Sequence, residues 1–143
     1  MVVRMKWISA IVVAAAVFGL LDFLWLGKVG KPLYDARLGP MLAERPNMTA
    51  ALLFYAIYVL GLTWFVTVPA IDAGSVGKAA IGGLFLGLLA YATWNLTNLA
   101  VLKDYPSSIV PIDMAWGSFA TMVTAVVTVL VVRALPFVET AGR

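Results

Sequence analysis

The sequence predicts an all-α integral membrane protein: a four-helix transmembrane bundle with a short interfacial helix in its first loop. Of the 143 residues, 63% are hydrophobic and only 12% are charged, and the mean hydropathy is +0.99. In a typical soluble domain roughly a quarter of the residues are charged. Because a spanning helix needs about 20 apolar residues, residues 1–143 have room for four spans. We expect these spans to form a single membrane domain.

The first apolar run extends from about residue 7 to residue 27, behind a basic leader that contains Arg4 and Lys6. The leader resembles the start of a secretory signal peptide, but the run is longer than the about 7 to 15 residues of a signal core. It ends in the segment Trp25–Lys28, which is typical of a membrane interface rather than of a cleavage site. We therefore predict a retained first span.

The segment from Lys28 to Asn47 contains charged residues and prolines that exclude it from hydrocarbon, and it forms the longest loop. Within it, apolar side chains recur at spacings of one, three and four residues. This spacing is typical of a short amphipathic helix that lies on the membrane surface. The apolar residues are Leu33, Tyr34, Leu38, Met41 and Leu42.

Three further apolar runs complete the predicted bundle. The second span is predicted over about residues 48–68, because Pro69 follows and residues 70–77 then have the composition of a turn. The third span is predicted over about residues 78–102. The fourth is predicted over about residues 111–132, with a proline in its first turn, where proline is favoured.

Four spans place both chain termini on the same side of the membrane. Lysine and arginine divide equally between the two predicted sides, five on each, so the positive-inside rule does not select an orientation. We expect a multi-pass protein of the bacterial inner (cytoplasmic) membrane, with both termini on the cytoplasmic side.

Two aspartates lie inside predicted spans, where an ionisable side chain is costly and marks a functional site by default. At a helix rise of about 1.5 Å per residue, the polar residues of all four spans fall within about 10 Å of one membrane face. Steps of three and four residues put the polar residues of each span on one helix face. We therefore predict a polar pocket that opens toward this face. Its candidate ligand-binding residues are Asp22, Trp25, Tyr55, Tyr58, Tyr91, Asn95, Asn98, Asp113 and Trp116.

Several of these residues also have a structural interpretation. Asp113 falls in the first turn of its helix, where the helix dipole and unpaired backbone amides favour a carboxylate. Asp22 lies near the C-terminal end of its span, where the dipole is unfavourable, and could instead pair with Lys28 or Lys103. The two asparagines could be hydrogen-bonding contacts between helices. The tryptophans could form interfacial belts.

The chain contains no cysteine and no histidine. This composition excludes disulfides, thiol chemistry, histidine acid–base catalysis and the commonest metal and haem ligands. We predict no metal site and no cofactor, and no nucleic-acid partner, because the basic residues form no dense cluster. The expected partners are membrane lipid, a small molecule of unidentified chemistry and, as an open alternative, a second copy of the chain.

The leading hypothesis is that the pocket binds a small polar, cationic or lipid-headgroup ligand through Asp22, for transport or a membrane-lipid process. A second hypothesis is a proton-coupled small-molecule exporter that uses Asp22 as its coupling carboxylate. A third is a non-catalytic assembly subunit of a membrane complex. An enzyme acting on lipid, with Asp22 and Asp113 as acid and base, is less favoured because the sequence has no nucleophile motif and no phosphate-binding loop.

Several segments together form a family pattern: Asp22–Gly27, Tyr34, Leu38–Gly39, Phe54–Tyr58, Tyr91–Ala100 and Asp113–Gly117. The most specific part is Asn95–Asn98 in combination with the later Asp-x-x-Trp-Gly. Over nearly the whole chain this pattern resembles the bacterial membrane-protein family named domain of unknown function 2177 (DUF2177). The resemblance implies four spans and no assigned activity. A Tyr–Asp pair commonly stands in that family where this chain has Trp94–Asn95, so no mechanism that needs a carboxylate at position 95 is implied here.

Overall fold

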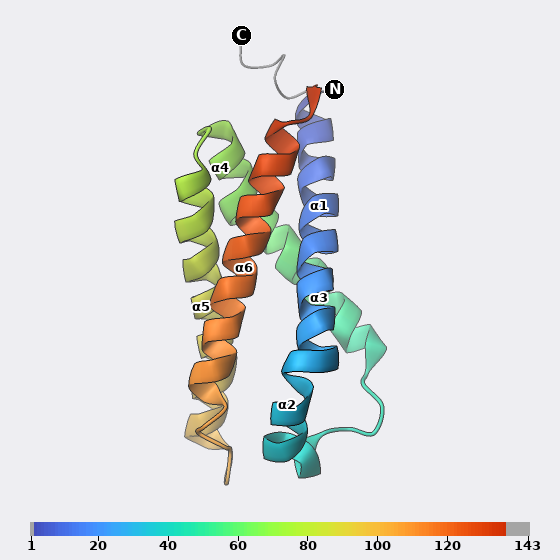
Figure 1. Ribbon diagram of the computed structural model, residues 1–143, viewed down its shortest axis with the longest axis vertical. Coiled ribbons are helices and arrows are strands. Elements are labelled where there is room, and N and C mark those ends of the chain that lie inside the picture. Colours follow the sequence, from blue (N-terminus) through green and yellow to red (C-terminus); the bar gives the residue numbers. More distant parts are fainter. Residues whose placement is uncertain (1, 137–143) are drawn as a thin grey trace.

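The computed structural model describes residues 2–136, and every regular element in this part of the chain is helical (Figure 1). Four helical segments are long and apolar enough to cross a membrane, which confirms the predicted all-α, four-span architecture. A short helix also lies in the first loop, as predicted. The elements are α1 (Val2–Leu24), α2 (Lys31–Leu38), α3 (Met48–Leu62), α4 (Val68–Asp72), α5 (Val76–Val101) and α6 (Val110–Arg133).

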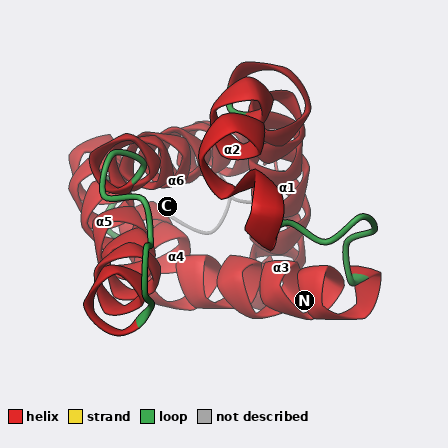
Figure 2. Ribbon diagram, turned by 90° about the horizontal axis from the view of Figure 1, so that it is seen from below, coloured by secondary structure: helices red, strands yellow, loops and turns green. Residues whose placement is uncertain are grey.

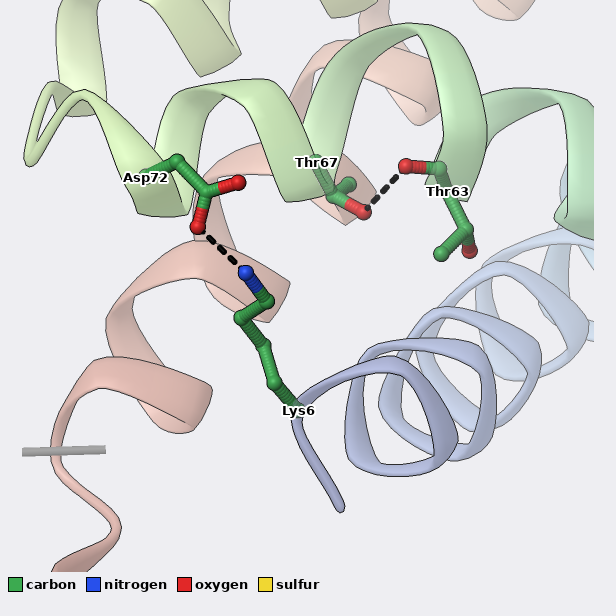
Figure 3. Close-up of polar contacts among 4 residues, drawn as sticks. All are labelled: Lys6, Thr63, Thr67 and Asp72. Atoms are coloured by element: carbon green, nitrogen blue, oxygen red, sulfur yellow. Dashed lines mark hydrogen bonds and ion pairs between the residues drawn. The ribbon is translucent and has the colours of Figure 1, made fainter. Parts of the chain in front are cut away.

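The second span does not stop at Pro69, as the sequence suggested, but continues to Asp72 as α4. A proline inside a regular α-helix lacks the backbone donor and clashes with the carbonyl one turn earlier. Here the five residues before α4, Thr63–Thr67, form a π-helical segment, and this wider turn accommodates the ring. The Thr67 hydroxyl donates to the Thr63 carbonyl at 3.4 Å (Figure 3). The predicted turn over residues 70–77 is correspondingly shorter, because α5 already begins at Val76.

Helices α5 and α6 form the closest pair in the bundle, and small residues make this possible. A Cβ atom on Gly87 would lie 2.3 Å from the Gly117 carbonyl oxygen, and one on Gly83 would lie 2.8 Å from the Met122 Cα atom. Such small residues let two helix backbones approach closely in lipid. The two glycines of α5 therefore pack on α6.

The second span crosses the bundle diagonally (Figure 1). Its C-terminal part, Thr63–Asp72, packs against α1, α5 and α6, whereas α3 packs mainly against α1. The N-terminal end of α3 lies well apart from α5 both in Figure 1 and in the view from below (Figure 2). The backbones of α3 and α5 therefore separate at this end of the bundle, whereas the second span packs against three neighbours at the other end.

The end of the bundle where α1 begins is closed by polar contacts and apolar packing. Lys6 forms an ion pair with Asp72 at the end of α4 (Figure 3). Arg133 donates to the Gly74 carbonyl at 2.9 Å, which joins the end of α6 to the turn before α5. Between these contacts and the middle of the bundle lies the largest apolar core, with Leu62 and Val129 at its centre. The predicted polar residues lie in the other half.

Candidate functional site

Asp22 and Asp113 are both buried in the half of the bundle that opens between α3 and α5. Asp22 lies near the end of α1 and is 6% exposed, and Asp113 lies in the first turn of α6 and is 7% exposed. Both carboxyl groups therefore lie inside the protein, in the half of the bundle where the helical period predicts them. Neither is turned toward the surrounding lipid.

The Asp22 carboxyl group accepts a hydrogen bond from the Tyr55 hydroxyl of α3. Phe18, one turn earlier on α1, packs edge-on against the Tyr55 ring, with the ring centroids 6.0 Å apart, and so orients it. The suggested ion pairs of Asp22 with Lys28 or Lys103 are not formed. The ion pairs present among residues 2–136 are Lys6 with Asp72 and Lys31 with Asp35.

Asp113 has donors on both carboxyl oxygens. The Tyr34 hydroxyl of α2 donates to Oδ1, and the Asn95 amide of α5 donates to Oδ2 at 2.6 Å. Asp113 lies in the first turn of α6, as the structural interpretation expects, and both of its carboxyl oxygens accept hydrogen bonds from neighbouring side chains. Three elements, α2, α5 and α6, meet at this carboxyl group.

Tyr34 is held in place from a second direction, by Trp25. The Trp25 indole donates to the Tyr34 hydroxyl at 3.0 Å. Gly30 makes this approach possible, since a Cβ atom there would lie 2.7 Å from the Trp25 indole nitrogen and 2.9 Å from the Tyr34 ring. Burial, and then the hydrogen bond to Asp113, raise the pKa of the Tyr34 phenol above its ordinary value. At neutral pH Tyr34 is therefore a protonated donor.

Aromatic rings form a large part of the surroundings of the two carboxyl groups. The Trp25 and Trp116 rings stack with centroids 4.4 Å apart and planes 6° from parallel. The Tyr91 ring lies directly on α6 at Gly117, where a Cβ atom would come within 2.1 Å of it. The indole nitrogen of Trp116 is buried without a hydrogen-bond partner in the described part of the chain. This nitrogen lies close to the Asp22 carboxyl group.

These residues surround a cavity of about 690 Å³. Its walls come from α1, α2, α3, α5 and α6 and from the two segments that follow α1 and α2. The lining residues are Asp22, Trp25, Leu26, Lys31, Tyr34, Asp35, Leu38, Leu42, Phe54, Ala90, Tyr91, Trp94, Asp113 and Trp116.

The nine residues singled out from the sequence divide into lining residues and supporting residues. Asp22, Trp25, Tyr91, Asp113 and Trp116 line the cavity. The other four lie outside the lining. Tyr55 bonds to Asp22, Tyr58 shares a hydrogen bond of 2.7 Å with Thr121, Asn95 is fully buried against Asp113, and the Asn98 amide nitrogen is buried without a partner.

Sequence reasoning missed the contribution of α2, above all that of Tyr34. The apolar periodicity of α2 was recognised, but it indicated a helix lying flat on the membrane. In the structure α2 covers one end of the cavity, and Arg37 donates to Ser108 of the third loop at 2.8 Å. An isolated tyrosine on an amphipathic helix gives no sign of the distant carboxyl group to which it bonds.

The site brings together two buried carboxyl groups, those of Asp22 and Asp113, and several aromatic rings. Lys31 and Asp35 also line the cavity and pair with each other, and no basic side chain pairs with either buried carboxyl group among residues 2–136. In the same part of the chain there is no group of three or more acidic, cysteine or histidine residues that could hold a metal ion. Carboxylates and aromatic faces are the groups that attract organic cations.

Comparison with known proteins gives a family but no relative of established activity. No curated protein and no solved structure matches the chain. A family model described as "Predicted membrane protein (DUF2177)" matches residues 7–130, well over half of the sequence. The chain therefore belongs to the DUF2177 family of predicted membrane proteins.

Proposed function

We propose that this membrane protein binds a small molecule that carries an amine or quaternary ammonium group, and that Asp22 is the anionic anchor for that group. One observation carries the proposal. Asp22 and Asp113 both line a cavity of about 690 Å³, and neither is paired with a basic side chain in the described part of the chain.

The energetic argument concerns the cost of a buried carboxylate. An ionised carboxyl group in a low-dielectric environment is strongly destabilised unless a cation or several hydrogen bonds compensate it. A bound ammonium group would supply the missing positive charge. The stacked rings of Trp25 and Trp116 and the ring of Tyr91 add attraction for an organic cation, because their faces carry negative charge density.

The two carboxyl groups are not equivalent in this proposal. A carboxylate has about four lone-pair sites for hydrogen bonds. Asp113 accepts a hydrogen bond on each oxygen, from Tyr34 and Asn95, whereas Asp22 accepts one hydrogen bond of standard geometry, from Tyr55 to Oδ2, with the Trp116 indole nearby. More of the bonding capacity of Asp22 is left for a ligand. We therefore assign the anchor role to Asp22 and an orienting role to Asp113.

The direct test replaces Asp22 by asparagine and measures the binding of benzyltrimethylammonium to the protein in lipid nanodiscs. Tryptophan fluorescence reports binding, because Trp25 and Trp116 line the cavity. We expect at least a tenfold loss of affinity, which is about 1.4 kcal/mol. Asp22→Glu keeps the charge and should retain binding. Binding by this variant would show that position 22 tolerates substitution, so that the loss in Asp22→Asn is due to the missing charge.

The matched control is Asp72→Asn, which removes a carboxylate at the opposite end of the bundle, outside the cavity. This variant should bind the probe like the native protein. Equal affinity in Asp22→Asn and native protein, or an equal loss in Asp72→Asn, would overturn the proposed anchor.

Proton-coupled export is a second candidate, with Asp22 as the coupling carboxylate. The observation that favours it is the closure of the cavity on one side by the apolar core around Leu62 and Val129. A transporter that exposes its site to one side at a time needs such a closed half. In proteoliposomes, a pH gradient should then drive flux of the benzyltrimethylammonium probe that disappears in Asp22→Asn. Binding without flux would leave the cavity as a binding site only.

A further inference from the structure

We infer that the ligand is an amphiphile taken from the membrane, an amine-bearing lipid or lipid-like amine, whose tail leaves the cavity sideways between α3 and α5. The inference rests on the proposed function, because it takes the cation-binding cavity as given. It adds the chemical class of the remainder of the ligand and the route by which the ligand enters.

The path of the second span creates the sideways opening. The π-helical segment and α4 hold this span against α5, whereas α3 packs mainly against α1. The N-terminal end of α3 consequently diverges from α5, as both Figure 1 and Figure 2 show. Among the described residues, no side-chain hydrogen bond joins α3 to α5; the bonds of α3 go to Asp22 on α1 and to Thr121 on α6.

Residues on both edges of this opening belong to the cavity wall and also reach the outer surface. Phe54 of α3 is 45% exposed and Trp94 of α5 is 60% exposed, and both line the cavity. Ala90, one turn before Trp94 on α5, also lines the cavity, and its side chain is small. The cavity therefore continues from two buried carboxyl groups to an apolar, exposed edge.

The surroundings of that edge are apolar as well. Ile57, one turn along α3 from Phe54, is exposed, as are Leu88 and Leu89 of α5. In a four-span membrane protein these side chains face hydrocarbon. A ligand with an ammonium group at one end and an alkyl chain at the other would place the ammonium group at the carboxyl groups and the chain at the apolar edge. Each buried methylene would contribute about 0.8 kcal/mol to the binding free energy.

The opposite entrance, at the end covered by α2, is fastened by side-chain contacts. Tyr34 is bonded to both Trp25 and Asp113, and Arg37 of α2 is bonded to Ser108 of the third loop. Lys31 and Asp35 of α2 also line the cavity and are exposed, so the edge at this end is charged. The edge between α3 and α5 is formed instead by Phe54, Ala90 and Trp94, which offer an alkyl chain apolar contacts.

The experiment compares two probes that share a headgroup and differ in the tail: tetramethylammonium and dodecyltrimethylammonium. Specific binding to the protein in nanodiscs is defined as the part lost in Asp22→Asn. Ala90→Trp narrows the opening, and Ala90→Leu narrows it less, which keeps the test usable if tryptophan prevents folding. The matched control is Ile81→Trp, at an exposed α5 position outside the cavity lining and away from the opening.

We expect dodecyltrimethylammonium to bind native protein at least a hundredfold more tightly than tetramethylammonium. In Ala90→Trp its affinity should fall at least tenfold while that of tetramethylammonium stays the same. Ile81→Trp should change neither affinity.

Two other outcomes have different consequences. If Ala90→Trp leaves both affinities unchanged, or lowers them equally, the lateral route is wrong, while Asp22-dependent binding of tetramethylammonium would still support the proposed function. If neither probe shows binding that depends on Asp22, the proposed function and the inference both fail.

Discussion

Asn95 and Asn98 lie one turn apart on α5 but have very different surroundings. Asn95 is fully buried, donates to Asp113 at 2.6 Å and to the Tyr91 carbonyl at 3.0 Å, and accepts from Tyr105 at 3.4 Å. The amide nitrogen of Asn98 is also buried but has no partner among residues 2–136. Asn95 therefore positions the Asp113 carboxyl group, whereas Asn98 has no comparable bond.

The first prediction compares leucine substitutions at these two positions. Asn95→Leu should lower the free energy of unfolding by about 2 kcal/mol, because it removes a donor from a buried carboxyl group. Asn98→Leu should cost much less, since no hydrogen bond of its amide nitrogen is lost. Thermal unfolding in detergent, followed by near-ultraviolet circular dichroism, measures both. Equal destabilisation by the two variants would contradict the positioning role of Asn95.

At the scale of elements, two contacts determine the geometry of the site: the close packing of α5 on α6 and the attachment of α2 to α6. The first depends on Gly83, Gly87 and Gly117, whose missing side chains let backbone and ring atoms meet. The second depends on Tyr34. Gly83 also packs against Ala125, which belongs to the apolar core at the closed end, whereas Gly87, Gly117 and Tyr34 lie outside that core.

The second prediction tests the α5–α6 contact with alanine. Gly87→Ala should destabilise the protein by roughly 1 to 3 kcal/mol through overpacking, because the new Cβ atom would meet the Gly117 carbonyl oxygen at 2.3 Å. Gly61→Ala is the matched control on α3, where nothing lies within 4 Å of a Cβ atom. It should be neutral or stabilise the helix by up to about 1 kcal/mol. The thermal unfolding of both variants measures the difference. If Gly87→Ala is as stable as the native protein, α5 and α6 can move apart at little cost and the predicted overpacking is wrong.

The third prediction concerns the attachment of α2 and its dependence on pH. The pKa of the Tyr34 phenol is raised in the folded state, whereas in the unfolded state it lies near the ordinary value of about 10. The stability that this phenol contributes is thus complete below about pH 10 and is lost as the pH rises further. Tyr34→Phe should lower stability by about 1 kcal/mol at pH 7. The variant should also lose less stability than the native protein between about pH 10 and 11.

The measurement is thermal unfolding of native protein and Tyr34→Phe across that pH range. Contributions that the native protein and the variant share cancel in the difference between their stabilities. An identical pH dependence of the two proteins would show that Tyr34 is not a protonated donor to Asp113 in solution.

At the scale of the whole molecule, the diagonal second span gives the two ends of the bundle different properties. At one end it packs against three neighbours and is tied to α1 by the ion pair of Lys6 with Asp72. At the other end it leaves α5 and exposes the cavity wall. The closed apolar half and the open polar half are thus consequences of one crossing angle.

The fourth prediction concerns topology. With four spanning segments, reporters fused before residue 1 and after residue 143 should lie on the same side of the membrane. Reporters inserted at residue 43, in the loop after α2, and at residue 107, in the loop before α6, should lie on the opposite side. Compartment-specific enzyme fusions or thiol labelling of single introduced cysteines measure this, and the absence of native cysteine removes background labelling. A split between the two terminal reporters would exclude an even number of spans.

Much of the architecture could be predicted from the sequence, because the insertion of a segment into the membrane depends on the hydropathy of consecutive residues. Hydropathy over about 20 residues determines whether a segment can span, and the helical period determines which residues share a face. These two quantities were enough to predict four spans, a helix in the first loop and the accumulation of Asp22, Tyr91 and Asp113 in one half of the bundle. The prediction that the second span ends at Pro69 was wrong. A proline usually ends a helix, and the composition of the segment does not predict the π-helical turn that accommodates this one.

Only the tertiary structure decided which partner each polar group has. Tyr34 donates to Asp113, Tyr55 donates to Asp22, and Lys28 and Lys103, the alternative partners considered for Asp22, do not pair with it. These pairings depend on the angle at which the second span crosses the others and on the fold of the first loop back over the cavity. Both are set by contacts between residues far apart in the chain, such as those of Gly87 with α6. The hydropathy and helical period of neighbouring residues do not predict such contacts.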